Sequence, residues 1–207
     1  ISAGTNNIFP LSCEGTRAGL VTGIFLKMLN SETDLPSGIS VNELIQQHKF
    51  LLAETDSWSE TALIDLAISR QASLGGRAIW DAEWLKAVFV TRCAPGASGL
   101  CGIPGGVMDI PPLSQHGAAA CLGNRFSVQA VLTPGRVQSV GLEAVERMNL
   151  HQLHTMEVSE GTVLADGERV RELHNEKVRI TLHPEGPRVL DFEATLAAGL
   201  QHGYFQI

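Results

Sequence analysis

The chain has 207 residues, 44% hydrophobic and 18% charged, which is enough for one sizeable core or two small ones in a folded protein. Its formal net charge is −7 with a pI of about 5.5, and no basic block interrupts this acidity. These features argue against nucleic acid and an anionic membrane surface as partners. No apolar run reaches the ~20 residues of a transmembrane helix.

The chain opens with ISAGTNNIFP, a short hydrophobic run interrupted by Gly4-Thr5-Asn6-Asn7. A strand, a tight glycine turn and a helix N-terminus together form an anion site, because free N–H groups and the helix dipole face one point. Asparagine amides cannot act as a general base at neutral pH, so this segment would position a ligand. An ordinary turn rich in asparagine is the alternative.

Residues 13–29 have helical periodicity, and we expect this helix to be buried on more than one side. Gly15, Gly19 and Gly23 would let another element approach closely. Glu14 lies in the first turn, where it either stabilises the helix dipole or holds a metal or a ribose hydroxyl. A polar boundary follows at 30–38, and Ser40-x-x-Glu43 fits a capping box.

The rest of the chain alternates short strands with turn signals, which predicts an antiparallel sandwich or barrel. The expected strands are 50–53, 62–69, 87–91, 118–122, 127–132, 137–142, 162–165, 170–173 and 178–182, and 192–200 reads as a helix. Segment 95–112 has five glycines and four prolines. It is either a passive surface loop or one whose small residues let a ligand lie against bare backbone.

Two acidic features stand out in this region. Asp65 lies in an apolar strand, where an unpaired carboxylate costs several kcal/mol, so it either pairs with Arg70 or Arg92 or serves a function. Asp166-Gly167 predicts a type I′ hairpin turn. Glu168 is not required by that turn and is therefore the more informative residue.

The spacing of the cysteines and histidines predicts neither a redox motif nor a zinc site. The four cysteines, Cys13, Cys93, Cys101 and Cys121, have no C-x-x-C spacing, which favours reduced thiols in the cytoplasm. His151 and His154 could share a helix face, yet no third ligand lies nearby, so we do not expect a zinc site there, and the sequence leaves the metal ligands unknown.

The motifs GTNNIFP, ALIDLAI, GGRAIWDAEWL, SGLCGIPGG and DGERV, in this order, resemble the superfamily of ATP-NAD kinases and diacylglycerol-type lipid kinases. They look most like its acetoin-catabolism X-protein branch, over nearly the whole chain. The resemblance implies a mainly β, α+β fold with an NAD kinase-like β-sandwich at 37–190. Segments 1–36 and 191–207 would be remnants of an N-terminal α/β domain, with 191–207 packing back toward that layer.

Kinases of this superfamily carry a Gly-Gly-Asp-Gly loop in the α/β domain, and this sequence has none. Since the chain also begins at Ile1, we expect the N-terminal part to be missing and this fragment to be inactive as a kinase. Members of the superfamily often associate through the β-domain, so the resemblance also implies a homo-oligomer.

The resemblance assigns nucleotide-binding roles to a set of residues by their match to family motifs: Gly4, Thr5, Asn6, Asn7, Glu14, Asp65, Gly105, Gly106 and Asp166. Asp65 takes the place of the acid that contacts the NAD ribose, but Ile64 replaces the neighbouring asparagine. Segment 97–111 is similar to the dinucleotide loop, with Leu100 where a tyrosine is usual. Glu168 matches the glutamate that helps deprotonate the acceptor hydroxyl, and is the expected catalytic residue.

The implied activity is Mg²⁺-dependent phosphoryl transfer from ATP to a hydroxyl of NAD or another small acceptor, including a lipid-type one. The alternative is a non-catalytic protein that binds or senses NAD or ATP in acetoin catabolism, which the changes at Ile64 and Leu100 favour. A β-rich assembly module without nucleotide binding is a third possibility.

Overall fold

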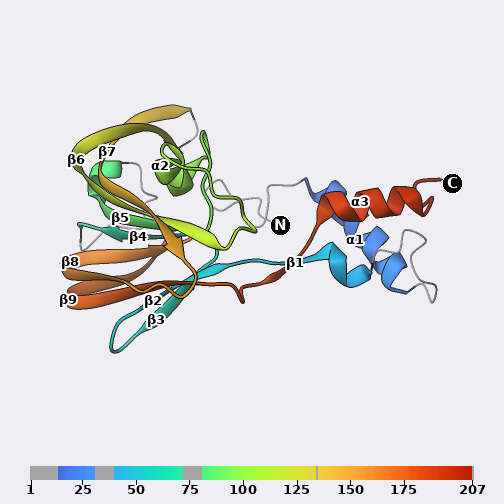
Figure 1. Ribbon diagram of the computed structural model, residues 1–207, viewed down its shortest axis with the longest axis horizontal. Coiled ribbons are helices and arrows are strands. Elements are labelled where there is room, and N and C mark those ends of the chain that lie inside the picture. The colour runs from blue at the N-terminus through green and yellow to red at the C-terminus, as the bar shows by residue number, and fades with distance from the viewer. Residues whose placement is uncertain (1–13, 31–39, 72–80, 134, 207) are drawn as a thin grey trace. The chain divides into compact units, whose positions relative to one another are not determined.

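The computed structural model describes residues 14–30, 40–71, 81–133 and 135–206. The chain divides into two units, one formed by Ile1–His48 with Pro187–Ile207 and the other by Lys49–Gly186. The sequence-based division placed the boundaries at 36/37 and 190/191 instead. Figure 1 shows the elements of both units along the chain.

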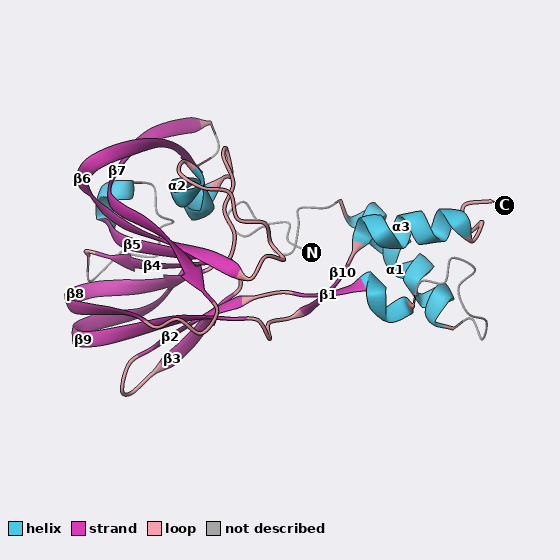
Figure 2. Ribbon diagram, viewed as in Figure 1, coloured by secondary structure: helices cyan, strands magenta, loops and turns pink. Residues whose placement is uncertain are grey.

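The larger unit is built on one antiparallel sheet with the strand order β3-β2-β9-β8-β4-β5-β6-β7. This confirms the predicted mainly β, α+β class (Figure 2). The strands are β2 (Phe50–Glu54), β3 (Ser59–Ala62), β4 (Asp65–Ser69), β5 (Leu85–Val90), β6 (His116–Thr133), β7 (Arg136–Asn149), β8 (His154–Ala165) and β9 (Glu168–His183).

Several predicted strands prove to be parts of longer ones. Segments 118–122 and 127–132 both belong to β6, and 170–173 and 178–182 both belong to β9. The residues Gly123-Asn124-Arg125, which look like a turn in sequence, lie where the β6–β7 register shifts between Leu122 and Phe126. A bulge bends a strand without ending it, so the composition suggested a break that is absent.

The end of the edge strand β7 meets strand β9 on the other side of the sheet order. A bridge joins Leu150, just after β7, to Leu182 in β9, and the His151 N–H donates to the Leu182 carbonyl at 2.8 Å. In Figure 1, β7 runs from the curved upper part of this unit down toward β8 and β9. The main apolar core draws on all eight strands of the sheet and includes Leu51, Leu66, Phe89, Met148, Val163 and Ile180.

The segment rich in glycine and proline is not an open loop. It forms η3 (Gly99–Cys101) and the short helix α2 (Gly102–Gly105), which is buried and packs against β6. A Cβ at Gly105 would lie 2.2 Å from the backbone oxygen of Ala94, so only glycine allows this approach. Nearby, η2 (Ala82–Trp84) is capped by Asp81, whose Oδ1 accepts from the Glu83 N–H.

The smaller unit contains α1 (Gly15–Leu29), η1 (Val41–Leu44), β1 (Ile45–Gln47), β10 (Arg188–Leu190) and α3 (Phe192–Gln201). Strands β1 and β10 pair antiparallel, and the predicted capping box at Ser40 and Glu43 is present. The C-terminal helix begins at Phe192, as the sequence predicted, and Asp191 caps it through the Ala194 N–H.

Helix α1 buries a single stripe, which corrects the expectation of burial on several sides. Ala18, Val21, Ile24 and Met28 are buried, whereas Leu20 and Leu29 are about half exposed. Nothing lies within 4 Å of a Cβ built at Gly15, Gly19 or Gly23, so these glycines do not serve close packing. The close contact comes from Gly199 of α3, where a Cβ would meet the Ile24 side chain at 2.7 Å.

None of the helices in the described residues combines the length and hydropathy that crossing a membrane requires.

We expect Gly105→Ala to lower the free energy of unfolding by about 1–3 kcal/mol, because the added methyl group meets backbone that cannot rotate away. Thermal or urea denaturation measures this change. Gly19→Ala is the control, since its Cβ meets nothing and alanine favours the helix by up to ~1 kcal/mol. Equal behaviour of the two variants would contradict the packing role of Gly105.

Candidate functional site

The Asp166-Gly167 turn connects β8 to β9 as a two-residue hairpin loop, with Ala165 paired to Glu168. Both turn residues have positive φ, 50° for Asp166 and 81° for Gly167. Positive φ at both central positions defines the type I′ turn, so the sequence-based prediction of this turn is confirmed.

The Asp166 carboxylate does more than form the turn. Its oxygens accept three backbone N–H groups, from Leu63 at 2.8 Å, Ile64 at 2.7 Å and Asp65 at 3.2 Å. Thr91 bonds the carbonyls of the same segment, with its N–H to Ile64 at 2.9 Å and its Oγ1 to Leu63 at 2.9 Å. The β3–β4 connection therefore satisfies its polar backbone through these two residues.

Asp65 begins β4 directly beside this turn. Its side chain is 5% exposed, and its Oδ1 has no hydrogen-bond partner among the described residues. Burial, and next the charge of Asp166, raise the pKa of Asp65 to about 7, although a hydrogen bond from the Gly167 N–H acts in the opposite direction. A buried carboxyl oxygen without a donor is costly, so it marks this position as a candidate ligand contact.

The sequence left open an ion pair between Asp65 and Arg70 or Arg92. Arg70 instead directs its guanidinium to two carbonyls, Leu85 at 3.0 Å and Leu122 at 3.5 Å. Arg92 is largely removed from water, which lowers its pKa, while a nearby Cys101 raises it. Among the described residues, no arginine forms an ion pair with Asp65.

Glu168, the predicted catalytic residue, is the first residue of β9 and directly follows Gly167. Its side chain is exposed, and within the described part of the chain it makes no hydrogen bond or ion pair. The structure thus brings Asp65, Asp166 and Glu168 to one end of the β4–β8–β9 sheet, with an exposed acid beside a buried one.

Glu14 lies in the smaller unit and caps α1. Its carboxylate accepts from the Thr16 N–H at 2.8 Å, the Thr16 Oγ1 at 2.9 Å and the Arg17 N–H at 3.1 Å. The backbone hydrogen bonds from Thr16 and Arg17 lower its pKa. This geometry fits the helix-stabilising alternative that the sequence offered for Glu14. Its predicted nucleotide contact stays a prediction.

Gly105 and Gly106 pack tightly, against Ala94 and against the Val128 side chain at 2.7 Å from an added Cβ. This packing explains both glycines without a ligand, and their nucleotide contact stays a prediction. Ile64 and Leu100, which the resemblance to ATP-NAD kinases aligned with an asparagine and a tyrosine, are both buried. Gly4, Thr5, Asn6 and Asn7 lie outside the described residues.

Lys49 is a buried residue that sequence reasoning missed, because a lysine at a strand end reads as a surface residue. Its Nζ donates to the His116 carbonyl at 2.5 Å, Ser114 Oγ at 3.2 Å and the Pro111 carbonyl at 3.5 Å. Burial lowers its pKa to about 8. The ammonium fixes the segment that enters β6 to the start of β2.

Cys93 and Cys101 are buried free thiols and Cys121 is an exposed one. Burial raises the pKa of Cys93 to about 11 and also raises the pKa of Cys101, so neither is poised as a nucleophile. His151 lies in a turn with φ 60° and His154 begins β8, so they share no helix face. The described residues contain no group of three or more potential metal ligands.

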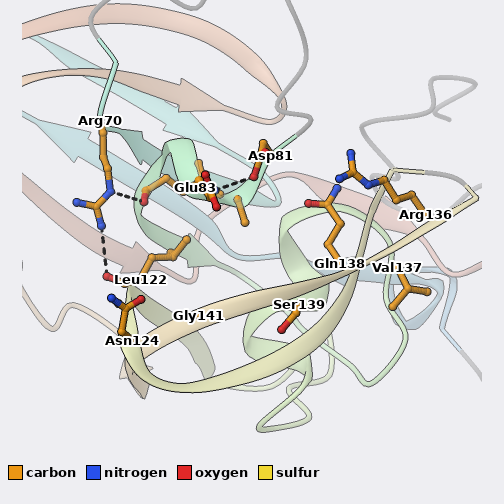
Figure 3. A pocket seen from close by; sticks show the side chains of 13 residues that line it. Arg70, Asp81, Glu83, Leu122, Asn124, Arg136, Val137, Gln138, Ser139 and Gly141 are labelled. Carbon is orange, nitrogen blue, oxygen red and sulfur yellow. Dashed lines mark hydrogen bonds between the residues drawn. The ribbon is translucent and has the colours of Figure 1, made fainter.

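A pocket of about 750 Å³ lies at the opposite end of β4. It is formed by the residue after β4, by η2 and by the facing segments of β6 and β7 (Figure 3). The side chains that line it are mainly polar: Arg70, Asp81, Glu83, Asn124, Arg136, Gln138 and Ser139. Of the predicted nucleotide-binding residues that the structure describes, none lines this pocket.

Comparison with known proteins gives the family. The model of the acetoin catabolism protein X C-terminal domain matches residues 49–185, which is more than half of the chain. The chain belongs to this family. The matched segment coincides closely with the larger structural unit, so the family corresponds to the sheet and its hairpin turn.

One relative from Cupriavidus necator is described as acetoin catabolism protein X and is 29% identical over 209 residues. That match covers 98% of this chain but 57% of the relative, so the chain spans little more than half of the relative's length. The acetoin-catabolism part of the resemblance seen in the sequence is thereby confirmed.

We expect Asp65→Asn to stabilise the protein more strongly at pH 8 than at pH 5. An unfolded aspartate titrates near ~4, so between about pH 4 and 7 the folded state binds more protons and stability falls as pH rises. Asparagine resembles the protonated acid and lacks this loss, which amounts to at most about 4 kcal/mol at pH 8. Denaturation at both pH values measures the difference from wild type.

The control is Asp56→Asn, which removes an exposed carboxylate whose ion pair with Arg179 lies at the surface. It should change stability little at either pH. A wild-type and Asp65→Asn difference that does not grow from pH 5 to pH 8 would contradict the raised pKa of Asp65.

Proposed function

We propose that this chain is the β-rich part of a nucleotide-binding protein of acetoin catabolism, in which Asp65 receives a ribose hydroxyl. The observation that carries the proposal is the buried Asp65 Oδ1 without a donor beside the β8–β9 turn. A ribose hydroxyl is a donor that would satisfy this oxygen. The family membership supports the link to acetoin catabolism.

The surroundings of Asp65 also determine how a ligand would reach it. The side chain is 5% exposed, and Cys101 of the glycine-rich segment lies close enough for the two groups to interact electrostatically. A ligand hydroxyl reaches the Asp65 Oδ1 only if the residues that bury it, including those around Cys101, shift locally. Ligand binding would therefore be coupled to a small rearrangement of η3 and α2, whose cost lowers the observed affinity.

This proposal predicts that nucleotide affinity rises with pH across neutrality. A ligand hydroxyl donates to the ionised carboxylate, so protonation of Asp65, with its pKa at about 7, competes with binding. We expect affinity to fall by up to ~10-fold per pH unit below 7 and to level off above about pH 8. Calorimetric titration of the full-length protein with ATP, NAD and NADH measures it.

Asp65→Asn should remove this pH dependence, and Asp56→Asn should retain it, because Asp56 lies on an exposed turn. Binding that is independent of pH in the wild type, or unchanged by Asp65→Asn, would show that Asp65 does not contact the ligand. Absence of binding to all three nucleotides would favour the β-rich assembly module.

Phosphoryl transfer is the second candidate, and the position of Glu168 favours it. Glu168 is an exposed acid one residue from the Gly167 N–H that contacts Asp65, so it could accept the proton of a hydroxyl on a ligand held there. ATP would be the phosphoryl donor. Asp166 uses its oxygens for three N–H groups, and the described residues offer no cluster of ligands for Mg²⁺. We assign no step to the metal.

For this candidate we expect Glu168→Gln in the full-length protein to reduce turnover by about 10²–10⁴-fold without weakening nucleotide binding. The assay follows formation of a phosphorylated product, with NADP as the product from NAD. Glu160→Gln is the matched control, since Glu160 is exposed on the neighbouring strand β8. Tight binding by wild type without any product would instead identify a sensor.

A further inference from the structure

The pocket beyond the end of β4 is a separate polar site. Arg70 follows β4 at five residues from Asp65, which corresponds to about 17 Å along an extended strand. Its volume of about 750 Å³ lies within the usual range for small-molecule sites. Figure 3 shows Arg70 and Asn124 on one side of the pocket and Arg136 and Gln138 on the other.

Arg70 is held in place without losing its charge. Its Nε donates to the Leu85 carbonyl at 3.0 Å and its second guanidinium nitrogen to the Leu122 carbonyl at 3.5 Å. Carbonyls orient a guanidinium but do not neutralise it, unlike the acids that pair with Arg171 and Arg179. Its remaining N–H groups are a positioned fork of the kind that binds phosphate and carboxylate.

The facing wall supplies a second cation and neutral groups. Arg136 at the start of β7 makes no ion pair within the described residues. The Asn124 amide and the Ser139 hydroxyl line the pocket, and no described residue bonds to either side chain. Both groups can donate to an anion. Neither arginine forms an ion pair within the described residues, although Asp81 and Glu83 line the same cavity.

The two acids in the pocket restrict where an anion can lie. Asp81 uses its Oδ1 to cap η2, and Glu83 follows in the first turn of that short helix. Their carboxylates repel an anion from the η2 wall and accept hydrogen bonds from donors on a ligand. The charge distribution therefore suits a molecule with anionic groups directed toward the two arginines and hydroxyl or amine groups directed toward η2.

We propose that this pocket binds a small polar molecule that carries phosphate or carboxylate groups, one at Arg70 and one at Arg136 on the facing wall. Asn124 and Ser139 add neutral donors, and the η2 wall selects ligands that carry donor groups of their own. This site is independent of the nucleotide contact proposed at Asp65.

Inorganic phosphate and citrate are the probes, titrated separately into the isotopically labelled protein and followed by NMR chemical shifts of the amides at 122–124 and 136–141. We expect saturable shifts in these segments. Arg70→Gln and Arg136→Gln should each weaken binding by about 10-fold, the loss of one charge-assisted contact. Arg147→Gln, an exposed arginine on β7 that does not line the pocket, is the matched control.

A stronger response to phosphate than to citrate identifies a phosphorylated ligand, and the reverse identifies a carboxylate. Shifts that do not saturate with either probe would overturn the proposal, as would equal weakening by Arg147→Gln and Arg70→Gln. Arg70→Gln should leave any Asp65-dependent nucleotide binding unchanged, and competition between phosphate and NAD would contradict two independent sites.

Discussion

The Asp166 carboxylate accepts hydrogen bonds from the backbone N–H groups of Leu63, Ile64 and Asp65. These bonds join two segments that lie about a hundred residues apart in sequence. Leu63 and Ile64 form the two-residue connection between β3 and β4, and Asp65 is the first residue of β4. Asp166 takes their N–H groups and Thr91 takes two of their carbonyls. Without this pairing the start of the central strand β4 would present buried polar groups to an apolar core.

These hydrogen bonds also give the neighbouring acids Asp166 and Asp65 different surroundings. The Asp166 carboxylate accepts three backbone N–H groups. Within the described residues, the Asp65 carboxyl accepts a hydrogen bond from the Gly167 N–H, its Oδ1 has no partner, and it is buried close to the charge of Asp166. Two carboxyl groups held in unlike surroundings are a common basis for binding and catalytic sites.

Much of the fold could be predicted from the sequence where local chemistry dominates. Asp166-Gly167 requires a type I′ turn, and Ser40 with Glu43 specifies a capping box. The prediction was wrong where tertiary contacts decide the outcome. Composition cannot show that Gly123 to Arg125 lie on a bulge of one continuous strand, or that Gly199, not a glycine of α1, provides the close helix contact.

The candidate site was predictable only in part for the same reason. An acid inside an apolar strand pointed to Asp65, and family resemblance pointed to Asp166 and Glu168. No local pattern shows that Asp166 would bind backbone across a hundred residues, that Lys49 would be buried, or that Arg70 and Arg136 would face one cavity. These relations arise from strand order and from the bend of the sheet, which pair distant segments.

The return of the sheet on itself also bears on solubility. The Leu150–Leu182 bridge closes one end of the β7 edge against β9, and the other margin of the sheet is the four-residue strand β3. Its sequence Ser-Glu-Thr-Ala keeps Ser59 and Thr61 exposed, with a charged residue between them. A short, polar margin is a poor template for strands of other molecules, so this architecture limits edge-to-edge aggregation at that side.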